Sequence, residues 1–295
     1  MTDGRKLFVF GCGFSARALI ERLKSQAIEM AGTTRSAEKA GKLEALGVTA
    51  YLFDAETGLD RADEALAGVT HLLLSVPPGK GPGDPVLAAE GERLKALAPD
   101  LEWVGYLSTT GVYGDRGGDW VDEESPLTPA TERGARRLAA EQAWAAFGRE
   151  TGVPVHLFRL AGIYGPHRNQ LKGLSEGTAR RIVKPGQVFS RIHVTDIAAV
   201  LEASIARDLP STAFNVCDDE PAPPQDVVAY AAELMGIAPP PEIAFEDADL
   251  SPMAASFYAE SKRCSNHRIK RDLEVTLTYP TYREGLRALY EEGAF

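Results

Sequence analysis

The sequence predicts an α/β fold in which a doubly wound parallel sheet carries a small C-terminal lobe. Over the first 110 residues, short apolar runs alternate with amphipathic segments at helical spacing, which is typical of strand–helix–strand units in a parallel sheet. A glycine-rich loop follows the first apolar run and opens the first helical segment. After about residue 165, glycines and prolines interrupt this pattern often, and the change predicts a separate, smaller lobe.

The expected elements follow one another closely along the chain. The apolar runs are short enough for strands, and they predict strands at residues 7–10, 28–32, 48–53, 71–76, 103–107 and 155–160. The amphipathic segments predict helices at residues 16–23, 36–46, 131–149, 195–206, 225–235 and 282–292. Because crossovers between parallel strands are almost always right-handed, a doubly wound Rossmann sheet is the simplest topology.

Composition excludes several other classes of protein. The 295 residues are 44% hydrophobic and 25% charged, close to the average of globular proteins, which excludes disorder and fibrous repeats. The net charge of −10 argues against nucleic acid as a partner. No apolar run approaches the ~18 residues that a membrane-spanning helix needs, so no membrane partner is expected.

The N-terminus and the cysteines indicate a cytoplasmic protein. Residues 1–6 lead directly into the first strand and lack the apolar core of a signal peptide. Cys12, Cys217 and Cys264 are odd in number, far apart and without C-x-x-C spacing. This pattern disfavours both disulfides and a zinc site, and a reducing cytoplasm is therefore expected.

The first loop carries the pattern G-x-G-x-x-G/A. Its glycines permit a tight turn and a close approach of the backbone to a pyrophosphate, and the small last residue permits packing of the helix on the strand. The phosphates would lie at the N-terminus of the helix, where N–H groups and the helix dipole favour anions. An ordinary glycine turn is the alternative, but the flanking strand and helix favour a dinucleotide site. The residues concerned are Gly11, Cys12, Gly13, Phe14, Ser15 and Ala16.

The end of the second expected strand favours NADP over NAD. Arg35 lies 24 positions after Gly11, and no acidic residue occupies positions 32–36. An arginine here suits the 2′-phosphate of NADP, whereas NAD sites usually carry an acid for the ribose hydroxyl. A solvated surface cation is the alternative interpretation of Arg35. Asp54 is a candidate for the adenine amino group, or else a turn residue at a strand end. The remaining predicted cofactor residues are Thr34, Ser36, Ala55 and Val76.

Several segments, in order, resemble the extended short-chain dehydrogenase/reductase family, the NAD-dependent epimerase/dehydratase group. They are Gly11–Ala16, Asp54-Ala55, STTGVYG at 108–114, RLAGIYGP at 159–166, IHVTD at 192–196 and Phe214-Asn215-Val216. The resemblance implies a seven-stranded Rossmann sheet, a small C-terminal substrate lobe and a Ser/Thr–Tyr–Lys catalytic group. It also leaves open a homodimer, formed through helices starting near residues 84 and 131.

The catalytic group of that family is only partly matched. Thr109 matches the Ser/Thr that orients the substrate oxygen, but alignment of the helix places Arg133 and Arg137 where the tyrosine and lysine belong. An arginine stays protonated and is no general base near neutral pH. The one Y-x-x-x-K, at 258–262, follows the sixth strand and is interpreted as a chance match. The sequence therefore resembles an atypical subgroup without the Tyr–Lys pair, in which Arg137 is expected to contact the cofactor ribose.

Other residues are candidates for proton transfer and substrate binding. Tyr113 borders the expected nicotinamide position as a candidate acid/base, although packing of its loop is the alternative role. The expected substrate residues are Arg133, Tyr164, Arg168 and Arg191, whose cations would converge on an anionic substrate if the lobes close as in relatives. A basic cluster at Lys262, Arg263, Arg268, Lys270 and Arg271 is interpreted as a solvated helix face, with an anion site as the alternative.

Together these observations predict an NADP-binding oxidoreductase or epimerase with a non-standard catalytic group. Its small-molecule substrate is expected to be anionic or a sugar nucleotide. The alternative is a non-catalytic NADP-binding sensor, or a module that binds a small anion or a partner. Residues 1–165 are expected to form the dinucleotide-binding core, with 188–217 returning to it. Residues 166–187 and 218–295 are expected to form most of the substrate lobe.

Overall fold

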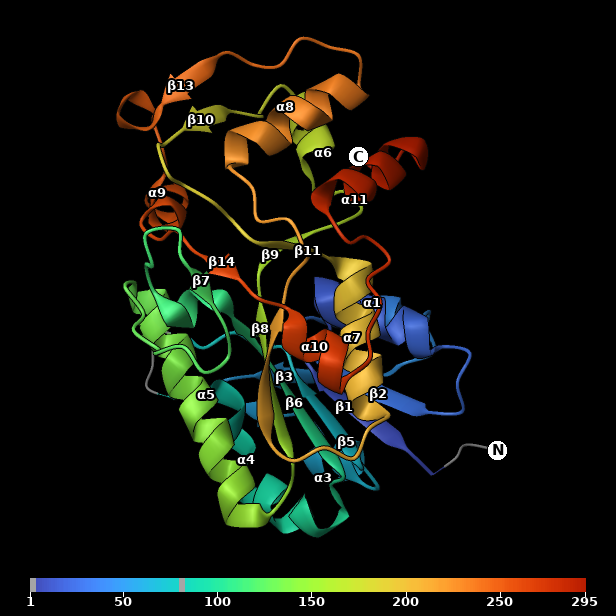
Figure 1. Ribbon diagram of the computed structural model, residues 1–295. Coiled ribbons are helices and arrows are strands. Elements are labelled where there is room, and N and C mark those ends of the chain that lie inside the picture. Colours follow the sequence, from blue (N-terminus) through green and yellow to red (C-terminus); the bar gives the residue numbers. More distant parts are fainter. Residues whose placement is uncertain (1–3, 80–82) are drawn as a thin grey trace. The chain divides into compact units, whose positions relative to one another are not determined.

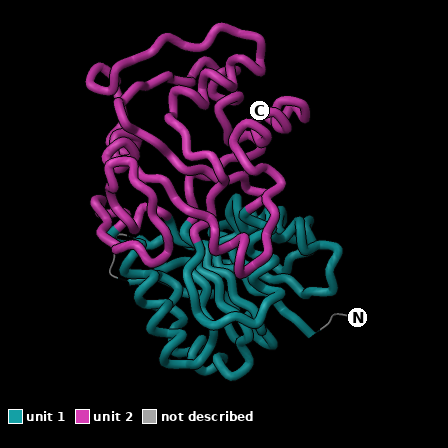
Figure 2. The backbone as a smooth tube through the Cα atoms, in the orientation of Figure 1, with its two compact units in different colours: residues 1–109, 135–159, 197–214 teal, residues 110–134, 160–196, 215–295 magenta. Residues whose placement is uncertain are grey.

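The computed structural model describes residues 4–79 and 83–295, and the chain divides into two compact units (Figure 2). The first comprises residues up to 109 together with 135–159 and 197–214. The second comprises residues 110–134, 160–196 and 215–295. Residues 1–3, which belong to the N-terminal segment that was predicted to lack the apolar core of a signal peptide, lie outside the described residues.

The first unit is built on one sheet of eight strands in the order β12-β8-β6-β5-β1-β2-β3-β4 (Figure 1). The strands around β1 pair in parallel, and only β4 is shown to run antiparallel, against β3. The doubly wound parallel sheet is therefore confirmed, with the short β4 as an eighth strand beyond the seven that the resemblance implies. The strands are β1 (Lys6–Phe10), β2 (Glu29–Thr34), β3 (Thr49–Asp54), β4 (Gly58–Leu59), β5 (His71–Leu74), β6 (Trp103–Thr109), β8 (Val155–Leu160) and β12 (Thr212–Val216).

Helices cover both faces of this sheet (Figure 1). Side chains of β1, β5 and β6 alternate between the faces, so Phe8, Leu72 and Val104 share one buried cluster with Leu94 of α4 and Trp144 of α5. Helices α1 and α7 lie on the opposite face (Figure 1). The helices that form on these strands are α1 (Phe14–Leu23), α2 (Ala37–Glu44), α3 (Ala62–Leu66), α4 (Pro85–Leu97), α5 (Glu132–Thr151) and α7 (Val194–Ile205), with a 3-10 turn η1 (Ala98–Asp100) after α4.

The pairing registers of the central strands place their carboxyl ends at one edge of the sheet. Val9 of β1 pairs with Gly32 of β2, and Phe10 pairs with Leu74 of β5. The strand order reverses at β1, because β2 and β3 follow on one side while β5 and β6 follow on the other. In open α/β sheets, ligands bind outside the carboxyl ends of the strands at such a switch point.

The second unit consists of short elements around its own core. One buried cluster joins Tyr164, Leu171, Val227, Tyr282 and Leu286. Three two-stranded pairings accompany it, β9–β11, β10–β13 and β7–β14. Its elements are η2 (Thr110–Tyr113), β7 (Trp120–Val121), β9 (Gly162–Tyr164), α6 (Gln170–Ser175), β10 (Arg181–Val183), β11 (Arg191–His193), α8 (Pro224–Leu234), β13 (Glu242–Ala244), η3 (Phe245–Asp247), α9 (Pro252–Tyr258), β14 (Arg263–Cys264), α10 (His267–Asp272) and α11 (Tyr282–Glu291).

The units group the chain differently from the predicted domain boundaries. Residues 110–134 were expected in the core but belong to the second unit. The reason is strand pairing, because β7 in this segment runs parallel to β14 near the C-terminus, with Trp120 opposite Arg263 and Val121 opposite Cys264. Residues 160–165 join the second unit as well, since β9 pairs with β11.

A buried ion pair joins three elements of the first unit. Arg159 of β8 donates from Nη2 to Oε2 of Glu141 on α5 at 3.0 Å, and both side chains are almost fully buried. Ser108 of β6 donates its hydroxyl to the same carboxylate. A buried charge without its partner is costly, so this arrangement holds α5 in one position on the sheet. Among the described residues, no helix is long and apolar enough to cross a membrane.

The ion pair gives a stability prediction. Glu141→Ala removes the carboxylate that neutralises the buried guanidinium of Arg159 and is expected to lower the free energy of unfolding by about 3–5 kcal/mol. The matched control is Glu150→Ala, because Glu150 pairs with Lys95 at 2.9 Å where both side chains are largely exposed. That change is expected to cost less than ~1 kcal/mol. Urea unfolding measures both values, and equal small losses in the two variants would contradict the assignment.

Candidate functional site

The turn from β1 into α1 is possible only with glycine at position 11. Gly11 has φ +87°, a conformation that side chains rarely adopt. A Cβ at this position would lie 3.0 Å from Cγ2 of Val76 and 3.2 Å from the carbonyl carbon of Ser75. The backbone N–H of Gly11 donates to the Thr33 hydroxyl at 2.8 Å, which ties the turn to β2. The turn is therefore fixed by its neighbours on both sides.

Gly13 is different, because the protein itself does not require a glycine there. Its φ of −81° is open to any residue. A Cβ added to Gly13 would meet only the Gly11 carbonyl oxygen, at 4.0 Å. The missing side chain leaves open space just before the first turn of α1, which carries no acidic residue and no side-chain cap. We call this open space at Gly13 the cradle. It fits the pyrophosphate of a dinucleotide, which needs a close approach to backbone N–H groups.

Cys12 fills the space between the turn and β2. Its N–H donates to the Thr33 carbonyl at 2.9 Å, and a Cβ on Gly32 would lie only 2.5 Å from its sulfur. Burial raises the pKa of the Cys12 thiol to about 12, although nearby Arg17 opposes the shift. The thiol is therefore un-ionised near neutral pH, which supports its interpretation as a packing residue.

The ends of β2, β3 and β5 supply the other predicted cofactor residues. Arg35 is exposed and forms no hydrogen bond or ion pair with any described residue, so its guanidinium is available to a ligand. Asp54 is also exposed, and its Oδ1 accepts from the Glu56 N–H at 2.9 Å, which is the contact expected of a turn residue. The other positions are Thr34 at the end of β2, Ser36 at the N-cap of α2, the exposed Ala55, and Val76 packed against Gly11.

The two predicted catalytic residues differ in accessibility. Thr109 is the last residue of β6 and is half-buried. Tyr113 ends the 3-10 turn η2, is fully buried, and donates its hydroxyl to Oδ1 of Asn215 at 2.7 Å. These contacts favour the packing role for Tyr113, which the sequence left open beside the acid/base role.

The two arginines of α5 that the sequence singled out have different environments. Nη1 of Arg137 donates to the Tyr106 hydroxyl at 3.1 Å and to the Leu107 carbonyl at 3.0 Å, so the side chain is half-buried against β6. Arg133, one helical turn earlier, is exposed, and its guanidinium carbon lies 5.7 Å from the ring centre of Phe257. Neither contact supplies a group that accepts a proton near neutral pH.

Two of the expected substrate residues are interior residues of the second unit. Arg191 is buried and donates from Nη1 to the carbonyls of Phe189 at 2.8 Å and Ala222 at 3.0 Å. Tyr164 is buried too, and its hydroxyl donates to the Thr281 carbonyl at 3.4 Å. The expectation that Arg191 and Tyr164 face a substrate is corrected by this burial, whereas Arg168 is exposed.

The basic cluster near the C-terminus is already paired within the second unit. Lys262 pairs with Glu260 at 2.7 Å, and Arg268 pairs with Glu124 at 2.6 Å. Lys270 and Arg271 pair with Asp219 and Asp272, and Arg263 donates to the Gly118 carbonyl. These pairings disfavour an anion site. The cluster is not one solvated helix face either, because Lys262 is buried and Arg263 lies in β14. In the described part of the chain, no group of three or more His, Cys, Asp or Glu side chains could hold a metal ion.

Comparison with known proteins found one family model that matches part of the chain. The model of the NAD dependent epimerase/dehydratase family matches residues 94–217. This match agrees with the resemblance that the motifs indicated. No curated protein matches the sequence.

Solved structures agree with this fold. A functionally unknown conserved protein from Silicibacter pomeroyi is 52% identical, with a TM-score of 0.89 over 99% of this chain and 100% of that chain. UDP-glucuronic acid 4-epimerase from Bacillus cereus, in complex with UDP-glucuronic acid and NAD, is 17% identical, with a TM-score of 0.76 over 97% and 98%. dTDP-glucose 4,6-dehydratase from Bacillus anthracis, in complex with NAD, is 16% identical, with a TM-score of 0.74 over 97% and 96%. At these low identities, the last two establish the fold alone.

The buried thiols give a reactivity prediction. Burial raises the pKa of Cys12 to about 12 and that of Cys264 to about 11, and it also raises the pKa of Cys217. Because the thiolate is the nucleophile, iodoacetamide at pH 8 is expected to label no cysteine rapidly in the folded protein. All three cysteines should react once the chain is unfolded in urea. A thiol that reacts rapidly in the folded protein would show that its site is more open than described.

Proposed function

We propose that the chain binds NADP at the β1–α1 turn and catalyses hydride transfer of the oxidoreductase or epimerase type. The observation that carries this proposal is the open cradle at Gly13, located where the strand order reverses. The match of residues 94–217 to the epimerase/dehydratase family model supports the same class of chemistry. The cradle also lies at the start of α1, where the helix dipole favours the negative charge of phosphates.

Arg35 supports NADP in preference to NAD. Its exposed guanidinium has no partner among the described residues, and no acid occupies the end of β2. A guanidinium binds a phosphate through charge-assisted, bidentate hydrogen bonds, whereas it offers no acceptor to a ribose hydroxyl. The related structures named above contain NAD, so the preference for NADP is a proposal about this chain's own residues.

Thr109 is the residue that we propose to orient the substrate oxygen. It ends β6, the strand next to β5 in the sheet. The bound nicotinamide would supply the hydride chemistry, which belongs to the cofactor. A bound water is the proposed proton carrier, because the Tyr113 hydroxyl is buried and donates its hydrogen bond to Asn215. The loss of a tuned acid/base group slows such a reaction by about 10²–10⁴-fold without abolishing it.

The proposed substrate is a small anionic molecule or a sugar nucleotide. Arg133 and Arg168 remain exposed on the second unit after Arg191 is excluded by its burial. Two of the related structures are named for enzymes that act on nucleotide-linked sugars. Arg137 retains N–H donors beyond the two hydrogen bonds of Nη1, and we propose that they contact the cofactor ribose.

A non-catalytic NADP-binding protein is the second candidate function. The observation that favours it is the pair of arginines on α5, Arg133 and Arg137, at the positions that the resemblance assigns to the catalytic tyrosine and lysine. An arginine side chain does not act as a general base near neutral pH. In this case NADP binding would persist without turnover.

Cofactor preference is tested by replacing Arg35. Arg35→Ser is expected to weaken NADPH binding by about tenfold or more while leaving NADH binding unchanged, because only NADPH loses a charge-assisted hydrogen bond. The matched control is Lys39→Ser, which removes an exposed cation from α2. Fluorescence titration of each variant with both cofactors measures the dissociation constants. An unchanged NADPH affinity in Arg35→Ser would assign Arg35 to the solvated surface.

Turnover is tested by replacing Thr109. A hydride-exchange screen with carbonyl compounds and sugar nucleotides is expected to detect activity in the wild type and a loss of about 100-fold in Thr109→Ala, because the substrate oxygen loses its orientation. The melting temperature of the variant serves as the folding control. Equal turnover in both proteins would remove Thr109 from the mechanism. NADPH binding with no turnover in either would favour the non-catalytic protein.

A further inference from the structure

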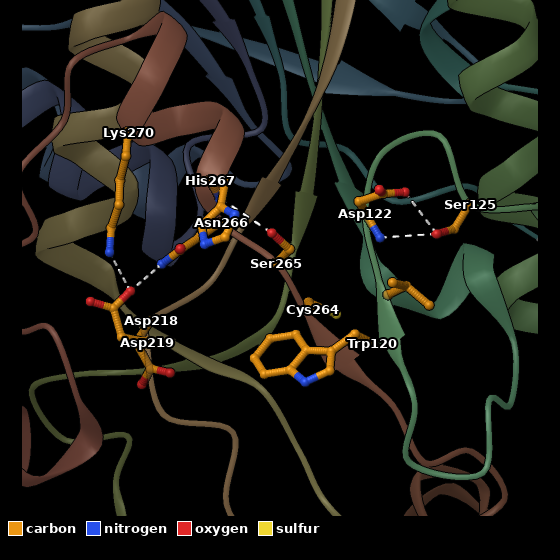
Figure 3. A pocket seen from close by; sticks show the side chains of 11 residues that line it. Trp120, Asp122, Ser125, Asp218, Asp219, Cys264, Ser265, Asn266, His267 and Lys270 are labelled. Carbon is orange, nitrogen blue, oxygen red and sulfur yellow. Dashed lines mark hydrogen bonds and ion pairs between the residues drawn. The ribbon is translucent and has the colours of Figure 1, made fainter.

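The second unit contains an open pocket of about 500 Å³ that none of the predicted cofactor, catalytic or substrate residues lines. Three segments far apart in the sequence form it (Figure 3). They are β7 with the loop after it, the residues after β12, and the end of β14 with α10. The lining residues used below are Trp120, Asp122, Ser125, Asp218, Asp219 and Lys270.

Trp120 provides an exposed aromatic face in this pocket. Its side chain is 61% exposed, whereas the other two tryptophans, Trp103 and Trp144, are buried. Figure 3 shows its indole between the Asp219 side of the pocket and the Asp122 side. Such a face is an attractive surface for a flat or cationic group, because the indole ring has the strongest cation–π interaction of the aromatic side chains.

The one lysine of the pocket lining does not make it an anion site. The Lys270 ammonium pairs with Oδ1 of Asp219, and the Asn266 amide donates to the same oxygen at 2.6 Å. The charges of Lys270 and Asp219 therefore cancel. The charge that remains in the pocket comes from Asp122, because burial raises the pKa of the Asp218 carboxyl well above its usual range.

Asp122 carries a negative charge without a cationic partner among the described residues. Its Oδ1 accepts from the Ser125 hydroxyl at 2.8 Å and from the Glu124 N–H at 3.1 Å, and both donors are neutral. These hydrogen bonds hold the pKa of Asp122 below its usual range, with the Ser125 hydroxyl as the main cause. The carboxylate is therefore ionised at neutral pH and faces the same pocket as the indole.

Asp218 adds a buried oxygen that lacks a donor. Its side chain is 1% exposed, and Oδ1 accepts from the Glu220 N–H at 3.3 Å. Oδ2 has no hydrogen-bond partner among the described residues. Burial also raises the pKa of this carboxyl well above its usual range. A buried polar oxygen without a hydrogen bond is costly, so a ligand that forms a hydrogen bond with Asp218 would relieve the cost.

We propose that this pocket binds a small organic cation whose charged head is flat or alkylated, such as a guanidinium or alkylammonium group. The charged head would lie on the Trp120 indole. The Asp122 carboxylate would balance its charge, and one of its N–H groups would donate to Oδ2 of Asp218. An anionic ligand would meet the uncompensated Asp122 charge, and a neutral ring would gain only the stacking contact. The proposal is independent of the proposed function, because it uses none of the dinucleotide-site residues.

The test uses n-butylguanidinium chloride, with n-butylurea as an uncharged probe of the same shape. Because Trp103 and Trp144 are buried, acrylamide quenches mainly the emission of Trp120 in the folded protein. Butylguanidinium is expected to protect this emission in a saturable manner, while butylurea and sodium butyrate do not. Equal protection by butylurea, or no protection by butylguanidinium, would overturn the proposal.

Two variants test the residues. Asp122→Asn retains an acceptor for the turn but removes the charge, and it is expected to weaken butylguanidinium binding by about fivefold, measured by calorimetry. Asp119→Asn is the matched control, because Asp119 is exposed beside Trp120 but does not line the pocket. Trp120→Ala is expected to weaken binding by a similar factor. An unchanged affinity in Asp122→Asn, with its melting temperature preserved, would overturn the role of charge.

Discussion

Gly11 lies at the carboxyl end of β1, where the strand order of the sheet reverses between β2 and β5. Its backbone must turn with φ +87° against Val76 and Ser75, and only glycine meets both conditions. This turn places the start of α1 at the same sheet edge as the ends of β2 and β3. The open space at Gly13 and the exposed guanidinium of Arg35 occupy that edge, so the position of the candidate site depends on this turn.

The interior of the first unit supports this edge through polar as well as apolar contacts. Glu141 accepts from both Ser108 of β6 and Arg159 of β8, which ties α5 to two strands. Arg137, on the same helix, donates to the Leu107 carbonyl of β6. Because buried polar groups are costly unless paired, these contacts define how the helix packs more strictly than apolar contacts alone do. Thr109 ends β6, the strand to which these α5 contacts are made, so they also fix the position of Thr109.

The sequence predicted the features that depend on local pattern. The strands around β1, the glycine turn and the start of α1 follow from periodicity and from residue types at fixed spacing. Burial of single polar side chains could not be predicted, because it depends on segments that meet only in the folded chain. Arg191 donates to Ala222, and Tyr113 donates to Asn215, over separations that no local pattern indicates. The pocket at Trp120 was missed for the same reason, since its walls come from three distant segments.

The most direct test of the account is the melting temperature of the protein with and without NADPH, compared between the wild type and Gly13→Ala. A ligand that binds only the folded state raises the melting temperature, and at a concentration of 100 times its dissociation constant it contributes about 2.7 kcal/mol. The account predicts a clear increase in the wild type. It predicts little or no increase in Gly13→Ala, whose melting temperature without ligand should be unchanged because the added Cβ meets no protein atom closer than 4.0 Å. If neither NADPH nor NADH raised the melting temperature of the wild type, the dinucleotide site would be contradicted.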